Sequence, residues 1–506
     1  MTHKTERFDR LVRDAMDEHK VPGFSIAIIH GEEIWSKGYG VAQLSGEPVT
    51  SDTIFDFASL SKSITASAVA LLVQDNEKYP DVQWTTPVSK LLPEDFVLED
   101  DYSTKNITIE DILSHRTGYP RHDDSYLGIR STNPDNAATI TRSLRHLPSN
   151  KPLRTTYQYN NIMYTVASHI VSTLTSQPYA NFLEQNVFKP LNMANTHHDV
   201  PTSPDAVSKL AHPHHWDKDT EKYIEIPMYA QPEGQGAGLI FTSASDYALH
   251  IQALMTRSGP LSAESHDALR TPRIPIQFDE DTKRRPFYSH AMYGFGCWIE
   301  NYRGFEVVGH NGGVAGFGSV ARWVGDKGFG FVTVGNGSGA AEIGELVFQI
   351  LLDDVIGVTE EEKVDWVEYA RKESREEEER EKERKEKEKK EAEVLERDRR
   401  EPTIELREYA GTYSHGGYHG LVVEFDEKEG VLKANCEDRC MPLLLTFKHK
   451  TGDEFLVEQY SVWGAYTYTV KGAFRVADEK VEAVGVAFEP AMEDVGDGLI
   501  WFTRVK

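Results

Sequence analysis

Apolar side chains recur every three or four positions near the start of the chain, which predicts an amphipathic helix whose buried stripe is Phe8, Leu11, Val12, Ala15 and Met16. The apolar segment 24–29 predicts a strand that turns back at Gly31. Helical patterns follow, and then strand patterns near 305–309, 320–324 and 329–334 precede an apolar helix at about 341–355. This order predicts an α+β fold, in which one antiparallel sheet is assembled from both ends of the segment and covered by helices.

A charged segment separates this part of the chain from the rest. Every residue from 372 to 391 except Ser374 is charged, and the two signs are interleaved. Glu and Lys four positions apart favour an exposed helix, while the missing apolar a and d positions argue against a coiled coil. We therefore expect a first domain over 1–358, a charged helical linker over 359–401 and a second domain over 402–506. Short strand patterns separated by turn residues predict a small antiparallel β-barrel in the second domain.

Charge and cysteine content narrow the choice of compartment and partner. The chain has 55 basic and 81 acidic residues, a net charge of −26, which argues against a nucleic acid as the main partner. Three cysteines cannot form a disulfide framework. No apolar segment approaches the roughly 18 residues that a membrane span needs, and the N-terminal residues lack a secretory h-region. We expect a cytoplasmic protein without a membrane partner, and a homo-oligomer is compatible with these features.

The strongest chemical signal is Ser59-Leu-Ser-Lys62, which leads into an apolar helical segment. Residues three positions apart share a helix face, so the Lys62 amine can lie against the Ser59 hydroxyl. The free N–H groups of the first turn point in the same direction. A buried lysine beside polar donors can lose its proton and serve as a base. Ser-x-x-Lys is common by itself, so its context decides.

Two further motifs follow along the chain. Tyr159-Asn160-Asn161 precedes a helical pattern, and His310-Asn311-Gly312-Gly313 lies on or just after a strand pattern. In this order and at these separations, the three motifs resemble those of the class C β-lactamase-like serine hydrolases. This family also holds DD-carboxypeptidases, D-aminopeptidases, esterases and some acyltransferases. Segments 21–27, 107–118 and 236–246 are similar to recurrent segments of the family, so that the resemblance covers about residues 5–355.

The resemblance implies a role for each motif residue. Ser59 would be the nucleophile, Lys62 would help to deprotonate it, and Tyr159 would be the general base and the acid for the leaving group. Asn161 would hold Lys62 or a substrate carbonyl, His310 and Gly312 would line the substrate site, and the backbone N–H groups of Ser59 and Gly313 would form the oxyanion hole. We expect no cofactor. We also expect no metal, because the neighbouring histidines lack paired carboxylate or cysteine spacing; these are His197, His198, His212, His214 and His215.

The third motif bears on the substrate. Penicillin-recognising members of the family usually have Lys-Thr-Gly where this chain has His310-Asn-Gly, and a neutral histidine does not attract a substrate carboxylate. The literal Lys450-Thr-Gly452 lies in the predicted barrel, where we expect a turn. We expect hydrolysis of an amide or ester bond in a small molecule or short peptide, of the D-aminopeptidase or esterase type. An acyltransferase would share the acyl-enzyme, so this alternative stays open, as does an inactive binding protein that has kept the fold.

The second domain carries a shorter resemblance. The segment 408–420, Glu-Tyr-Ala-Gly-Thr-Tyr-Ser-His-Gly-Gly-Tyr-His-Gly, is similar to the opening of lipocalin-like domains appended to some of these hydrolases. Such a domain can lean over the active site or mediate assembly, and the sequence does not choose between them. The aromatic run 293–298 fits either a pocket lining or core packing. Cys436 and Cys440 are too widely spaced for a zinc knuckle, and we expect structural thiols.

Overall fold

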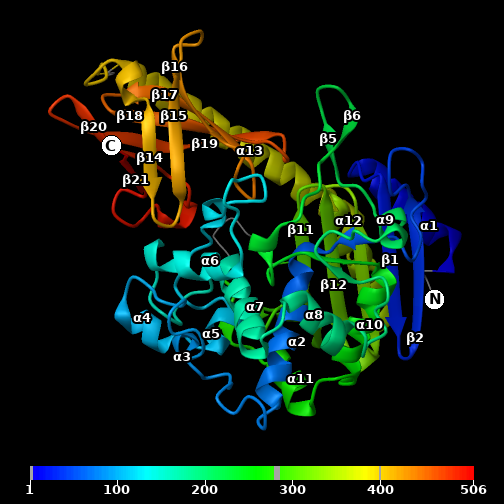
Figure 1. The fold of residues 1–506 in the computed structure, drawn as a ribbon. Helices are drawn as coiled ribbons and strands as arrows, with labels where there is room; N and C mark the ends of the chain where they lie inside the picture. The colour runs from blue at the N-terminus through cyan, green and yellow to red at the C-terminus, as the bar shows by residue number, and fades with distance from the viewer. Residues whose placement is uncertain (1–3, 278–284, 398–399, 506) are drawn as a thin grey trace. The chain divides into compact units, whose positions relative to one another are not determined.

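The computed structural model describes residues 4–277, 285–397 and 400–505. By its internal contacts the chain forms two compact units (Figure 1). The first consists of Met1–Arg121 and Asp135–Val358, and the second consists of His122–Pro134 and Thr359–Lys506. The short segment His122–Pro134 therefore groups with the C-terminal unit, although in sequence it lies within the predicted first domain. Among the described residues no helix combines the length and apolarity that a membrane crossing requires.

The first unit is built on an eight-stranded antiparallel sheet with the order β2-β1-β13-β12-β11-β10-β9-β8. Its strands are β1 (Gly23–His30), β2 (Glu33–Gly40), β8 (Ile274–Pro275), β9 (Met292–Tyr293), β10 (Trp298–Tyr302), β11 (Phe305–Val314), β12 (Phe317–Val324) and β13 (Phe329–Gly335). The two ends of the segment meet where β1 pairs with β13, with Ile26 opposite Thr333. The predicted α+β fold is confirmed, and so is the hairpin at Gly31, whose φ is 61°.

Helices cover both faces of this sheet, which explains why β12 and β13 are buried along their whole length (Figure 1). On one face Phe348 of α12 (Ala340–Ile356) packs against Phe331, with ring centroids 5.6 Å apart. On the other face Ile251 of α10 (Ala244–Thr256) lies against Gly330. Helix α1 (Glu6–Glu18) packs against α12 and buries its predicted stripe except Leu11, which is half-buried.

The first unit contains further helices. They are α2 (Ser61–Gln74), α3 (Val88–Leu91), α4 (Asp101–Asn106), α5 (Ile109–Leu113), α6 (Ala137–Ser143), α7 (Asn161–Thr175), α8 (Tyr179–Leu183), α9 (Pro204–Ser208) and α11 (Ala263–Arg270). Helix α2 is central, since it contacts α7 and α11 and is buried at almost every position. A small three-stranded sheet precedes α2 in the chain through its strand β3 (Phe55–Asp56), which pairs with β7 (Ile240–Thr242), and β7 pairs with β4 (His197–His198). A separate hairpin is formed by β5 (His214–Asp217) and β6 (Lys222–Glu225).

The second unit contains a closed antiparallel barrel in which each strand pairs with its neighbours in sequence, the up-and-down arrangement of lipocalins (Figure 1). Its strands are β14 (Gly411–His415), β15 (His419–Asp426), β16 (Val431–Cys436), β17 (Leu443–Thr451), β18 (Glu454–Ser461), β19 (Tyr466–Ala477), β20 (Lys480–Val486) and β21 (Ile500–Arg504). Pairing of Tyr413 with Arg504 closes the barrel. The predicted barrel is confirmed, and Gly452 lies at the turn between β17 and β18.

The barrel unit takes in two further pieces of chain. Most of the charged segment forms helix α13 (Trp366–Arg397). The segment His122–Pro134 is held by backbone hydrogen bonds, from Gly128 N–H to the Asp438 oxygen at 2.8 Å and from Cys440 N–H to the Tyr126 oxygen at 3.0 Å. His122 contributes its ring as well, because Nδ1 lies 2.7 Å from the Tyr418 hydroxyl. This unit is therefore assembled from two stretches that are far apart in sequence.

Candidate active site

Ser59 lies in a tight 3₁₀ turn, Ala58–Leu60, directly before α2. Ala58 has a φ of 48°, in the left-handed region that an alanine rarely adopts. The Asp56 carboxylate holds this backbone, because its Oδ1 accepts the Ala58 N–H at 2.7 Å. Asp56 is buried, and burial raises its pKa to about 7. The side chain of Asp56, the last residue of β3, thus holds the backbone of the turn.

Lys62 is fully buried and follows Ser59 by three residues, as the sequence predicted for a shared face. Its Nζ donates to Ser59 Oγ at 3.1 Å, to Asn161 Oδ1 at 2.8 Å and to the Ala237 carbonyl oxygen at 2.9 Å. An ammonium has three N–H donors, so these three bonds use all of them. Asn161 therefore holds Lys62, one of the two possibilities left open by the sequence.

Tyr159 reaches the same hydroxyl from the loop before α7. Its phenol donates to Ser59 Oγ at 2.7 Å, and Lys62 Nζ lies 4.7 Å from the centroid of its ring. The next residue, Asn160, caps α7 by accepting the Met163 N–H at 3.0 Å. The Asn160 amide also donates to the Tyr119 and Pro120 carbonyl oxygens, at 3.2 and 2.5 Å. The loop that carries Tyr159 is therefore anchored to the segment after α5.

The third motif lies within β11, which extends to Val314 and thus continues past the predicted end of the strand. Gly312 approaches the Ser59 turn closely, since a Cβ at this position would lie 2.2 Å from the Phe57 carbonyl oxygen and 2.3 Å from Ser319 Oγ. The Ser319 hydroxyl donates to the same carbonyl at 3.0 Å. Only glycine allows this approach, and it places Gly313, the next residue of the strand, near the turn.

His310 is buried in the site and is only 4% exposed. Its Nδ1 lies 2.5 Å from the Asn311 carbonyl oxygen, which can only accept, so Nδ1 carries the proton and Nε2 accepts from the Tyr293 hydroxyl at 3.1 Å. The Trp298 ring stacks on the imidazole with 4.6 Å between centroids. Burial, with the nearby Lys62 ammonium, lowers the pKa of His310 to about 3. The imidazole is therefore neutral at any physiological pH.

Three features of the site were not assigned from the sequence. The Ala237 carbonyl is a backbone group with no side-chain signature. Arg322 is a buried residue of β12, the strand next to β11. Its Nη2 donates to Asn311 Oδ1 at 2.7 Å and pairs with Glu345. His115 contacts the loop that carries Tyr159, and its place in a recurrent family segment was the only signal for it. The aromatic run 293–298 supplies Tyr293 and Trp298, which contact the His310 ring, while Tyr293, Phe295 and Cys297 are buried as core residues.

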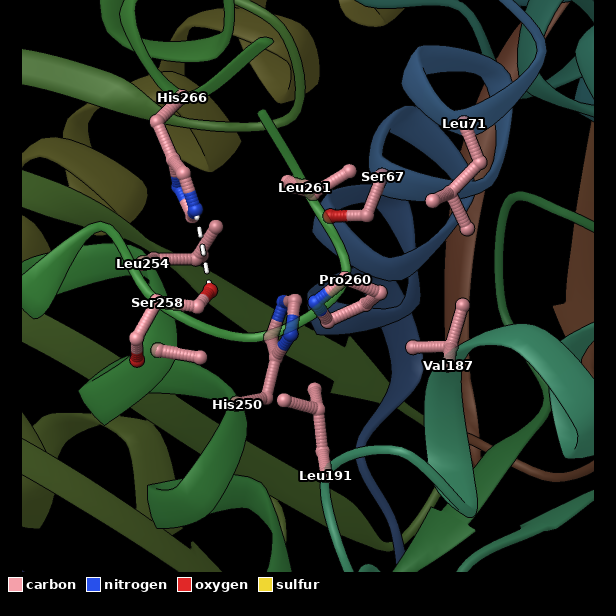
Figure 2. A pocket seen from close by; sticks show the side chains of 11 residues that line it. Ser67, Leu71, Val187, Leu191, His250, Leu254, Ser258, Pro260, Leu261 and His266 are labelled. Atoms are coloured by element: carbon pink, nitrogen blue, oxygen red, sulfur yellow. Dashed lines mark hydrogen bonds between the residues drawn. The ribbon is translucent and has the colours of Figure 1, made fainter. Parts of the chain in front are cut away.

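A small cavity borders the far part of α2, at Ser67 and Leu71 (Figure 2). Its lining is mainly aliphatic, and none of the motif residues contributes to it. One of its polar side chains is His266, whose Nε2 lies 3.1 Å from the Ser258 carbonyl oxygen. In the part of the chain that the structure describes, no cluster of three or more His, Cys, Asp or Glu side chains could hold a metal ion.

This arrangement can carry out nucleophilic acyl chemistry. One hydroxyl is in contact with both an amine and a phenol, each able to move a proton, and it lies in the turn directly before α2. The structure brings together Ser59, Lys62, Tyr159, Asn161, His310 and Gly312, although they come from three separate stretches of sequence.

Comparisons with known proteins agree with this geometry. The Beta-lactamase family profile matches residues 8–352. A protein described as unguisins hydrolase ungD' from Aspergillus campestris is 33% identical over 98% of this chain and 91% of its own length. An octameric penicillin-binding protein homologue from Pyrococcus abyssi superposes with a TM-score of 0.58, at 19% identity, over 98% of this chain and 99% of its own. The D-amino acid amidase from Ochrobactrum anthropi SV3 gives a TM-score of 0.57, at 22% identity, over 68% of this chain and 99% of its own. The chain therefore belongs to the beta-lactamase family, as a serine hydrolase of the peptidase and esterase type.

Proposed function

We propose that the protein hydrolyses an amide bond through an acyl-enzyme on Ser59. The observation that carries this proposal is the double contact of Ser59 Oγ, 2.7 Å from the Tyr159 phenol and 3.1 Å from Lys62 Nζ. In this proposal Lys62 is an ammonium that donates to its three acceptors, and an adjacent ammonium favours the phenolate form of a tyrosine. In the reactive form the Tyr159 phenol has released its proton to solvent, so that it accepts from Ser59 Oγ as the general base, and Lys62 stabilises its charge.

The proton and the bonds balance in two half-reactions. Ser59 Oγ attacks the carbonyl carbon while its proton moves to the Tyr159 phenolate, and the phenol returns this proton to the leaving nitrogen as the C–N bond breaks. Water then attacks the ester, gives its proton to Tyr159, and Ser59 leaves with that proton. The backbone N–H groups of Ser59 and Gly313 stabilise the oxyanion in both halves. The close approach of Gly312 to Phe57 supports this assignment, because it brings β11 to the Ser59 turn.

The substrate that we propose is a neutral or amine-bearing amide in a small molecule or short peptide. An ester in the same kind of molecule is the second candidate. A neutral His310 offers no charge to a carboxylate next to the scissile bond. The Trp298 ring stacks on the imidazole, is partly exposed and adds apolar surface beside it. The name of the D-amino acid amidase supports the amide, and the relative named as an unguisins hydrolase supports a hydrolytic reaction.

The test combines a covalent probe with a substrate panel. A phosphonylating reagent should add one adduct to the intact mass, absent in Ser59→Ala and present in the matched control Ser67→Ala, which removes another buried hydroxyl of the same unit. D- and L-amino acid amides, neutral esters, unguisins and penicillins are then compared, with and without an added amine acceptor. An adduct that persists in Ser59→Ala would refute the nucleophile. Acyl transfer to the amine in preference to water would identify an acyltransferase instead.

A further inference from the structure

His115 occupies a backbone position that favours glycine. It follows the end of α5 with a φ of 56°, and it is completely buried. Helices commonly end with a glycine in this left-handed conformation, and another residue there costs on the order of 1 kcal/mol. A side chain retained at such a cost points to a task for that side chain.

The contacts of His115 lie on both sides of Tyr159. Its carbonyl oxygen accepts the Gln158 N–H at 2.8 Å, and its Nδ1 accepts the Asn160 N–H at 3.0 Å. Between these two bonds its ring packs on the Tyr159 ring, with centroids 4.5 Å apart and planes inclined by 38°. The residue thus bonds to the backbone on both sides of Tyr159, at Gln158 and at Asn160, and packs on the phenol ring itself.

The protonation state of His115 follows from the same contacts. A backbone N–H can only donate, so Nδ1 is unprotonated and the ring proton of the neutral imidazole is on Nε2. Burial, reinforced by Lys62, His310 and Arg121, holds the pKa of His115 well below its ordinary value. The rings of Tyr157, Tyr164 and Tyr293 surround the imidazole. A cationic ring would lose the bond to Asn160 and repel the Lys62 ammonium.

We propose that His115 is a positioning residue, which fixes the Tyr159 hydroxyl at Ser59 Oγ by accepting the Asn160 N–H and supporting the phenol ring. This inference rests on the proposed function of Tyr159. It predicts that loss of His115 lowers the rate of the acyl step while substrate binding persists, because the phenol is displaced and the binding surface is not. A displacement of about 1 Å can cost roughly 10²-fold in rate.

The first experiment compares variants that differ at the acceptor. His115→Gly relieves the backbone and removes both contacts, and we expect kcat to fall about 10- to 100-fold with KM changed less than about threefold. Asparagine tolerates the left-handed region and places an oxygen near the position of Nδ1, so His115→Asn should regain at least about threefold of the loss. Ser176→Gly, at another left-handed helix end, is the control and should match the parent. The phosphonylating probe gives the active fraction of each sample, so that misfolding is not counted as a slower rate.

The second experiment is a double-mutant cycle with Tyr159→Phe. If His115 acts through the phenol, His115→Gly should cost less than about threefold in the Tyr159→Phe background, although it costs much more in the parent. Full additivity, parental kcat in His115→Gly, or an Asn variant no better than the Gly variant would overturn the positioning role and leave the proposed function standing. Parental kcat in Tyr159→Phe would instead overturn the base assignment, and the inference with it.

Discussion

A Cβ added to Gly312 would lie 2.2 Å from the carbonyl oxygen of Phe57, so the backbone of the third motif packs directly against the residue before the Ser59 turn. Gly312 belongs to β11. Phe57 lies between the end of β3 and the turn that carries Ser59. The close contact is between backbones, which cannot rotate away. The glycine in the motif therefore allows β11 to lie this close to the Ser59 turn.

Gly312→Ala should separate β11 from the Ser59 turn. Overpacking of this kind typically costs about 1–3 kcal/mol of stability, and the displaced turn should lower kcat/KM by roughly 10²-fold. Thermal unfolding and steady-state kinetics measure the two effects. Gly325→Ala is the control, because a Cβ at this position meets nothing within 4 Å. Parental kinetics in Gly312→Ala would show that the contact does not position the turn.

His310 should not respond to pH in the physiological range. An unperturbed histidine gains charge as the pH falls from 8 to 6, but burial lowers the pKa of His310 to about 3. The titratable or charged groups around it are Lys62, His115, Tyr159, Tyr293 and Arg322. We compare an ester substrate that has a free carboxylate with the same ester whose carboxylate is replaced by a neutral carboxamide. The ratio of their kcat/KM values should therefore stay constant between pH 8 and 6. A rise in this ratio at pH 6 would show a protonated imidazole.

His310→Lys should shift selectivity toward carboxylates. A charge-assisted hydrogen bond contributes about 1.5–3 kcal/mol, or roughly 10- to 150-fold, to binding of an anionic group. We expect that gain in kcat/KM for carboxylate-bearing substrates relative to neutral ones, measured on matched pairs. His30→Lys adds the same charge at an exposed position and should leave the ratio unchanged. A ratio that also stays constant in His310→Lys would mean that this position does not contact the substrate carboxylate.

Buried histidines should make the fold sensitive to acid. Burial lowers the pKa of His250 and His310 to about 3 and that of His198 to about 4. The unfolded chain binds protons below about pH 6.5 while these rings stay neutral in the fold, so stability is lost as the pH falls below 6.5, by about 2 kcal/mol for each ring at pH 5. Asp56, with its pKa raised to about 7, acts in the opposite direction as one group.

Urea unfolding at pH 7 and pH 5 measures this effect. His250 lies outside the reactive cluster and contacts Ser63 Oγ at 3.0 Å. Its replacement in His250→Gln should flatten the pH dependence by about 2 kcal/mol between pH 6.5 and 5, whatever it does to stability at pH 7. Equal stability of the parent at pH 7 and pH 5 would refute the protonation argument.

Cleavage in α13 should leave the two fragments associated. Side chains between Lys372 and Glu383 are largely exposed, so a Lys- or Glu-specific protease should cut there first. The barrel unit also contains His122–Pro134, which is continuous with the first unit on both sides. The nicked chain should therefore show two bands on a denaturing gel and one peak by native size exclusion. Two native peaks would show that the hydrogen bonds of His122–Pro134 do not hold the barrel.

The sequence by itself determined the features that depend on local periodicity. The strand and helix patterns predicted the sheet built from both ends and the barrel, because alternation and helical spacing are properties of neighbouring residues. The contact of Lys62 with Ser59 is local in the same way, since three residues separate them. The motifs and their order were enough to indicate the family, which the comparisons confirm.

The tertiary structure decided the features that depend on partners far away in sequence. The third acceptor of Lys62 is the backbone oxygen of Ala237, and a backbone group leaves no mark in the sequence. His310 is neutral because several elements bury it, and burial is a sum over the whole unit. His115 meets the Tyr159 loop only once α5 and α7 have packed together. The barrel takes up His122–Pro134 for the same reason: unpaired backbone groups find partners by proximity in space, which no local pattern encodes.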